Sequence, residues 1–294
     1  MSTGRILVIG GTGATGAEAV RHLLARGAQV RVVTRDPSAA ADNPALQGAE
    51  LVAGDSSQPE TLKEAFEDVE KVYLVPPTHP GWDETQSAII DMAAAAGVRH
   101  LVKLSVFEAD PDEPSLILRF HHRGEQEIER HGMAFTHIRA NSFFQNVLLL
   151  DAPAVQAQSC FYSCVGDAKF AKIDARDIGE VVAKVLTEPG HENRTYELTG
   201  PAALSYDDIA AELSRACGRE IRYVDMPPED YAALLTSVGV PQWLAEEFAT
   251  LYGRGKQRAG ASARTTSTVE DLLGRPPRSF ADWAREHADL LRAV

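Results

Sequence analysis

Short apolar runs alternate with stretches of helical periodicity through the first half of the chain. The apolar runs predict strands at residues 6–9, 29–34, 50–53, 71–75, 100–105 and 135–139. The periodic stretches between them predict helices at 14–26, 59–66, 83–96 and 115–130. A repeated strand–helix order with short connections is typical of a parallel sheet with helices on both faces. The predicted fold class is therefore α/β, a Rossmann-like doubly wound parallel sheet.

The pattern changes at about residue 152, where helical stretches become more frequent than apolar runs. Residues 178–187 form a predicted helix with Asp177 as its cap, and Ser205 caps a later one. We therefore divide the chain into a dinucleotide-binding domain over residues 1–151 and a smaller, mainly helical substrate-binding lobe over 152–294. A strand at 195–199 is expected to rejoin the sheet of the first domain.

A glycine-rich turn, Gly10-Gly-Thr-Gly-Ala-Thr-Gly16, joins the first strand to the first helix. Glycine lets the backbone approach a pyrophosphate closely, and a helix N-terminus offers free N–H groups with partial positive charge. The spacing differs from the G-x-G-x-x-G of the commonest dinucleotide folds. However, the strand and the helix lie where a phosphate site requires them, which favours a nucleotide site over a purely structural turn.

The residues after the second and third strands bear on which dinucleotide is bound. Proteins that prefer NAD place an acid after the second strand to hold the ribose 2′-hydroxyl. This chain has Thr34 and then Arg35, whose guanidinium can pair with a 2′-phosphate, while Asp36 comes one residue late. The pattern favours NADP(H) over NAD(H), the alternative being that Arg35 is only a surface residue. Asp55, after the third strand, is placed either to contact adenine or to cap the next helix.

Composition and charge narrow the class of protein further. The 294 residues are 44% hydrophobic and carry a formal net charge of −13, so nucleic acid is not an expected partner. The one compact basic stretch, at 254–258, is interpreted as a solvated loop. The chain has no apolar run of ~20 residues and no signal-peptide pattern, so we expect a cytoplasmic protein without membrane partners. Three cysteines without C-x-x-C spacing predict neither disulfides nor a metal site, and the sequence does not indicate an oligomeric state.

Several of these segments together resemble the NmrA-like, atypical short-chain dehydrogenase/reductase family. The resemblance is carried by the glycine turn and by the segments 100–105, 121–146, 174–178 and 274–284. Members of that family are either reductases of quinones, dyes and iminium compounds or sensors that bind NAD(P) without catalysis. The resemblance implies the same fold over nearly the whole chain.

The resemblance also implies positions for the cofactor and the acceptor. The phosphates would be held by Gly10, Thr12, Gly13, Ala14, Thr15, Gly16 and Arg35. Adenine would lie near Asp55 and Ser56, and the nicotinamide end near Pro76, Pro77, Ser105, Val106 and Asn141. An apolar acceptor pocket beside the nicotinamide is expected from Trp82, Phe107, Phe143, Trp243 and Tyr252.

One departure from ordinary short-chain dehydrogenases changes the expected chemistry. Their Tyr-x-x-x-Lys pattern, aligned here on Glu125, becomes Ile117-x-x-x-His121. Ketone reduction builds an alkoxide that needs a proton donor, and Ile117 has no proton to give. An iminium carbon needs hydride alone, and the product anion of a quinone is delocalised. Ser105 and His121 are the catalytic candidates, although His121 could equally make only a local hydrogen bond.

The sequence leaves two main functions open. The first is an NADPH-dependent reductase of a small electrophilic, conjugated acceptor such as an iminium compound, a quinone or a dye. The second is a non-catalytic NADP(H)-sensing regulator, which the missing tyrosine permits. An isomerase or lyase that retains its cofactor is a third possibility. Turnover of NADPH against a panel of acceptors separates the first two.

Overall fold

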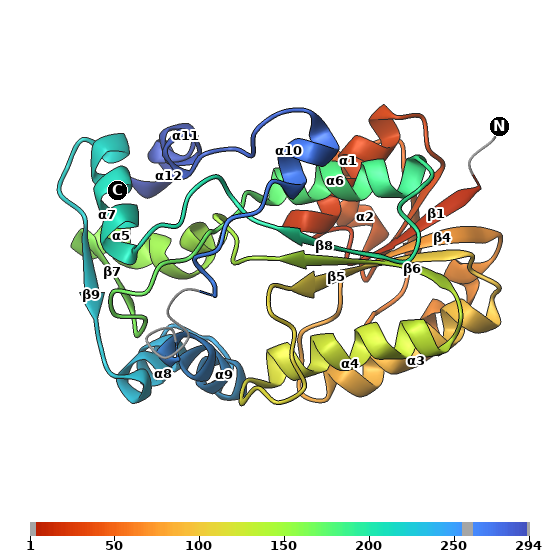
Figure 1. Ribbon diagram of the computed structural model, residues 1–294, viewed down its shortest axis with the longest axis horizontal. Helices are drawn as coiled ribbons and strands as arrows, with labels where there is room; N and C mark the ends of the chain where they lie inside the picture. Colours follow the sequence, from red (N-terminus) through yellow and green to blue (C-terminus); the bar gives the residue numbers. More distant parts are fainter. Residues whose placement is uncertain (1–3, 255–260, 293–294) are drawn as a thin grey trace.

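A seven-stranded sheet forms the centre of the computed structural model, which describes residues 4–254 and 261–292 (Figure 1). The strand order is β3-β2-β1-β4-β5-β6-β8, and neighbouring strands are parallel. The strands are β1 (Arg5–Ile9), β2 (Val30–Thr34), β3 (Glu50–Ala53), β4 (Val69–Leu74), β5 (His100–Val106), β6 (Ala134–Ala140) and β8 (Arg194–Leu198). The predicted fold class is confirmed. Most of the basic stretch at 254–258 lies outside the described residues.

Both faces of the sheet are covered by helices, which explains the continuous apolar runs of its central strands. In β1, Ile6 and Val8 enter one hydrophobic core while Leu7 and Ile9 enter the other, and all four are fully buried. Helices α1 (Ala14–Ala25) and α6 (Ala175–Thr187) cover the first face. The second face carries η2 (Pro59–Phe66), α3 (Trp82–Ala95) and α4 (Leu116–Arg130) (Figure 1). Of these, η2 is a 3₁₀ helix and not an α-helix.

Helix α6 packs closely on α1, so it belongs to the large domain although the boundary at 151/152 places it in the small lobe. A Cβ on Gly179 would lie 2.5 Å from the Cβ of Glu18, which shows how near the two helices approach. The cap of α6 also differs from the prediction: Asp174 accepts the N–H of Arg176 at 2.9 Å. Asp177 is instead fully buried and binds two arginines of the C-terminal segment.

The small lobe lies at one end of the sheet and has its own apolar core (Figure 1). A two-stranded parallel sheet, β7 (Cys160–Ser163) with β9 (Arg222–Asp225), forms part of it. The helices that pack on this core are η3 (Val147–Asp151), α5 (Ala152–Gln158), α7 (Tyr206–Cys217), α8 (Pro228–Ser237), α9 (Gln242–Gly253), α11 (Phe280–Glu286) and α12 (Ala288–Leu291). The remaining short helices, α2 (Pro37–Ala40), η1 (Pro44–Leu46) and α10 (Thr268–Leu273), pack on the large domain. None of the helices in the described ranges is long and apolar enough to span a bilayer.

Candidate active site

The glycine turn has the geometry that a close-approach phosphate loop requires. Gly10 has a φ of +81°, which favours glycine, and its carbonyl accepts the N–H of Gly13 at 3.1 Å. A Cβ on Gly16 would lie 2.1 Å from that same carbonyl oxygen. Helix α1 begins directly after Gly13, and no side chain in the described residues caps it. The first-turn N–H groups of α1 are therefore placed to bind an anion.

Two residues of opposite charge follow β2, Arg35 and Asp36, and they differ in their contacts. Arg35 is exposed, whereas the Asp36 carboxylate accepts the N–H groups of Ser38 and Ala39, each at 3.0 Å, as the cap of α2. The Asp36 carboxylate is thus used to cap α2, whereas Arg35 has no part in that cap.

Asp55 is tied into its own loop after β3. Its carboxylate accepts the backbone N–H of Ser57 at 2.9 Å and the Ser57 hydroxyl at 2.7 Å. These bonds, with a smaller contribution from the nearby Arg35, lower the pKa of Asp55. Gln58 precedes η2, so Asp55 is not the cap of that helix. Ser56 follows Asp55 and is half-buried at the same edge of the sheet.

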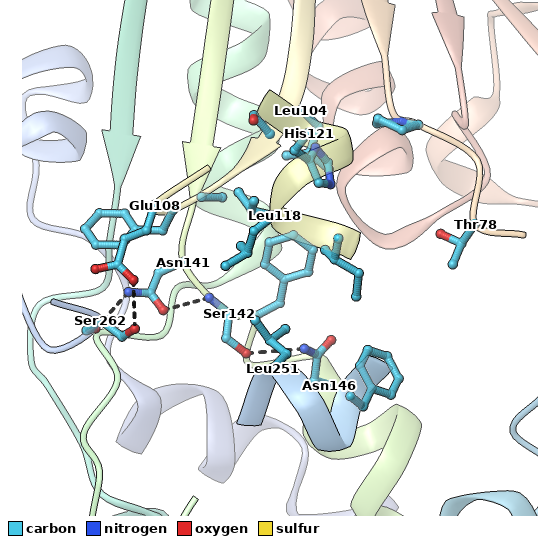
Figure 2. A pocket seen from close by; sticks show the side chains of 18 of the residues that line it. Thr78, Leu104, Glu108, Leu118, His121, Asn141, Ser142, Asn146, Leu251 and Ser262 are labelled. Carbon is cyan, nitrogen blue, oxygen red and sulfur yellow. Dashed lines mark hydrogen bonds between the residues drawn. The ribbon is translucent and has the colours of Figure 1, made fainter. Parts of the chain in front are cut away.

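A cavity of about 390 Å³ opens at the carboxyl ends of β4, β5 and β6. Figure 2 shows side chains from α4, from the segment after β6 and from α9 converging on it. Most of its wall is aliphatic or aromatic, as is usual for a small-molecule site. The predicted residues that line it are Pro76, Pro77, Trp82, Ser105, Val106, Phe107, His121, Asn141, Phe143 and Tyr252.

Trp243 does not belong to the described residues that line the cavity. Helix α9 turns Leu244, Phe248 and Leu251 toward the cavity, and these positions recur at the spacing of one helical face. Trp243 precedes this stripe by one residue and is rotated away from it. The i, i+4, i+7 spacing was visible in the sequence, but its direction depended on how α9 docks.

Beneath the cavity, a lysine that the sequence analysis did not select contacts His121. The ammonium of Lys103 lies 2.9 Å from His121 Nδ1 and donates to the Leu104 carbonyl at 3.2 Å. Lys103 is fully buried, and this burial lowers its pKa to about 7. Burial and the adjacent Lys103 charge hold the pKa of His121 well below its ordinary value, so its imidazole is neutral at pH 7. The available signal was a lysine in an apolar strand two residues before Ser105, and hence on the same face.

Glu125 joins Ser105 to Arg139 next to this pair. The Ser105 hydroxyl donates to Glu125 Oε1 at 2.5 Å, and Arg139 donates to both carboxylate oxygens, at 3.0 and 2.5 Å. Burial alone would raise the pKa of Glu125, but Arg139, Lys103 and Ser105 outweigh it and the pKa lies below its usual value. Ser105 therefore stands at the cavity wall with its proton directed at a buried carboxylate.

Comparisons with known proteins show that this chain is similar to oxidoreductases that use a nicotinamide dinucleotide. The chain belongs to the NmrA-like family, whose model matches residues 2–273. An NAD(P)H azoreductase of Xenophilus azovorans is 39% identical over 96% of this chain and 98% of its own. A (4-alkanoyl-5-oxo-2,5-dihydrofuran-3-yl)methyl phosphate reductase of Streptomyces griseus is 37% identical over 97% of this chain and 98% of its own. The NADPH complex of the quinone oxidoreductase QOR2 of Escherichia coli has a TM-score of 0.84 at 29% identity, covering 96% of this chain and 99% of that one. The expected family is confirmed.

Proposed function

We propose that the protein transfers hydride from NADPH to a small conjugated acceptor of the azo-dye, quinone or iminium type. The observation that carries this proposal is the apolar cavity at the carboxyl ends of β4, β5 and β6, whose wall includes Ile117. The family resemblance aligns this position with the tyrosine of ordinary short-chain dehydrogenases. When bound, the reduced nicotinamide supplies the hydride. The names of the relatives support the same class, because an azo group, a quinone and an oxo-dihydrofuran each carry a conjugated π system.

The chemistry of the wall explains why such an acceptor suits this site. A conjugated acceptor spreads the incoming electron pair over several atoms, so it does not require a strong acid at one oxygen. Ile117 contributes only apolar surface, whereas His121 places a neutral imidazole at the cavity. A neutral imidazole N–H can donate a hydrogen bond to the negative charge that develops on the acceptor. A simple ketone would receive less help from the same residues.

We also propose that the protein prefers NADPH to NADH and binds it along the carboxyl ends of the strands. The glycine turn from Gly10 to Gly16 would hold the pyrophosphate, and Arg35 the 2′-phosphate. Asp36 supports this preference because its carboxylate already caps α2. Asp55 and Ser56 would lie toward adenine, and Pro76, Val106 and Asn141 toward the nicotinamide.

The oxidation of NADPH against a panel of acceptors tests this function. The panel holds an azo dye, a 1,4-quinone, a cationic triphenylmethane dye, a cyclic iminium compound and a simple aliphatic ketone as control. We expect turnover of conjugated acceptors to exceed that of the ketone by at least about 100-fold, the lower range of the effect of a missing general acid. Tight NADPH binding without turnover of any acceptor would overturn the proposal and favour a regulator that senses the cofactor.

A further inference from the structure

We propose that Lys103, acting through His121, supplies the proton that an azo acceptor takes up after hydride transfer. This inference rests on the proposed function and assigns roles within the same cavity. His121 would be the catalytic residue, because it lines the cavity. Lys103 would be a positioning residue that fixes the tautomer of His121 and replaces the proton it gives away.

The hydrogen bond between the two side chains has a defined direction. While Lys103 is an ammonium it has three donors and no acceptor, so His121 Nδ1 at 2.9 Å accepts from it in that state. A neutral imidazole that accepts at Nδ1 carries its proton on Nε2. The edge contact with Trp82, whose ring centroid is 5.1 Å away, helps to hold the ring in place. The ring, which lines the cavity, thus carries its N–H on the nitrogen that does not face the lysine.

Lys103 reaches the cavity only by way of His121. Lys103 is fully buried and is not one of the described residues that form the cavity wall, whereas His121 is. Within the described ranges, no carboxylate lies within 4.0 Å of its ammonium as an ion-pair partner. Glu125, the carboxylate that favours its charge, is already bound by Arg139 and Ser105. The ammonium is therefore not neutralised by a direct ion pair.

Burial and the charges around Lys103 together set the pH at which it can act as an acid. Helix α4 contributes His121 and Glu125, and strand β6 contributes His137 and Arg139. Burial lowers the pKa of Lys103 most, Glu125 raises it and Arg139 lowers it, with a result of about 7. An acid with a pKa near the working pH is well matched to proton transfer.

The proposed step balances in atoms and electrons. The hydride forms a new bond to one azo nitrogen, and the electron pair of the N=N π bond moves to the other nitrogen. The Nε2–H bond of His121 breaks as its proton moves to that second nitrogen, and a proton moves from Lys103 Nζ to Nδ1. Lys103 is left as a neutral amine and His121 as a neutral imidazole protonated at Nδ1. The neutral amine stays beside the Leu104 carbonyl and the Nδ1–H. A solvent proton that arrives at Nε2 returns the Nδ1 proton to Nζ and restores the ammonium.

The test compares two acceptors in the full-length enzyme with NADPH. An azo dye needs hydride and protons, whereas a cationic triphenylmethane dye needs hydride alone and gives a neutral product. For Lys103→Met we expect kcat on the azo dye to fall about 10–100-fold and the decline of activity above pH 7 to disappear. The kcat on the cationic dye should change less than about twofold, because no proton is transferred there.

Two further variants separate chemistry from folding. Lys103→Gln keeps an N–H donor for His121 Nδ1 but has no acidic proton, so it should behave like Lys103→Met on the azo dye. Lys71→Met removes another lysine from the same sheet, one that donates to the Leu186 carbonyl at 2.6 Å outside the cavity wall. This control should leave the rates on both dyes unchanged. Equal loss on both dyes in the Lys103 variants, or full azo activity, would overturn the inference.

A readout that does not need turnover keeps this inference distinct from the proposed function. Nitrogen-15 NMR of labelled histidine should show His121 protonated at Nε2 at pH 6. The shift of Nδ1 should then change near pH 7 in the wild type and not in Lys103→Met. A ring protonated at Nδ1 at pH 6 would overturn the inference even if every acceptor is reduced. Absence of turnover in the wild type would instead refute the proposed function.

Discussion

Gly16 is the position where a single methyl group should test the geometry of the dinucleotide turn. In Gly16→Ala, the new Cβ would lie 2.1 Å from the Gly10 oxygen and 2.8 Å from the Gly10 carbonyl carbon and the Gly11 Cα. All three are backbone atoms, so no side chain can rotate to make room. Gly13→Ala is the matched control, because its Cβ would lie 3.5 Å from the Gly10 oxygen at an ordinary φ of −81°.

Helix propensity alone predicts that Gly16→Ala raises the free energy of unfolding, whereas the short backbone contacts predict that it lowers it. Alanine at Gly16 would gain about 1 kcal/mol as a helical residue. Overpacking commonly costs about 1–3 kcal/mol, and a contact this short with backbone belongs at or beyond the upper end. We expect Gly16→Ala to lose about 2 kcal/mol of unfolding free energy. Gly13→Ala should lose only about 0.5 kcal/mol, since glycine is modestly preferred at an N-cap.

Guanidinium unfolding followed by circular dichroism measures these differences, and NADPH fluorescence measures the effect on the site. The affinity of Gly16→Ala for NADPH should fall at least about 10-fold, which corresponds to 1.4 kcal/mol, because the Gly10 carbonyl must move. A Gly16→Ala protein as stable as the wild type would refute the reasoning. It would mean that the turn relaxes freely and that the close approach of Gly16 to Gly10 does not constrain it.

Three other predictions follow from contacts around the site. Arg35→Ala should weaken NADPH binding about 10–100-fold and leave NADH binding nearly unchanged, since a charge-assisted hydrogen bond contributes about 1.5–3 kcal/mol; titration with both dinucleotides measures this. Glu125→Gln should lose about 2–3 kcal/mol of stability at pH 7, because it leaves Arg139, still one-quarter exposed, without its carboxylate. The folded pKa of Glu125 is depressed, so its contribution is present above the unfolded pKa and lost as pH falls; denaturant unfolding between pH 7 and 3 should show a smaller acid loss in the variant. Phe248→Ala should raise KM for an aromatic acceptor about 10-fold and leave NADPH affinity intact, and an equal loss for both ligands would contradict its placement in the acceptor wall.

The parts of the fold that were predictable are those that local pattern decides. The apolar run of β1, the glycine turn and α1 follow one another in sequence, and each is recognisable by itself. The placement of α6 was not predictable in this way, because it depends on contacts across the chain. Gly179 fits against Glu18, and Asp177 is held by Arg275 and Arg278 from the C-terminal segment. No local feature near α6 indicates these partners.

The site shows the same division. Residues at the carboxyl ends of parallel strands were predictable, because those ends meet at one edge of the sheet. Ser105, Val106 and Asn141 indeed line one cavity. Lys103 was not selected because its partner is decided by the rotation of α4, which brings His121 over it. The sequence does not show the rotation of α9 about its axis, because packing sets it. Trp243 is therefore expected in the wall from sequence, although Leu244, Phe248 and Leu251 are the α9 residues that line the cavity.

The packing of α6 on α1 has a consequence for how the dinucleotide site comes into being during synthesis. Arg26, at the end of α1, donates to Glu188 at 2.8 Å and to Thr187 at 3.3 Å, more than 160 residues downstream. A nascent chain that has emerged only as far as residue 151 still lacks α6 and the edge strand β8. Its glycine turn is present, but the outer side of α1 and the free edge of β6 are bare. The surroundings of the dinucleotide site are therefore complete only after about two-thirds of the chain has been made, when α6 covers α1 and β8 pairs with β6.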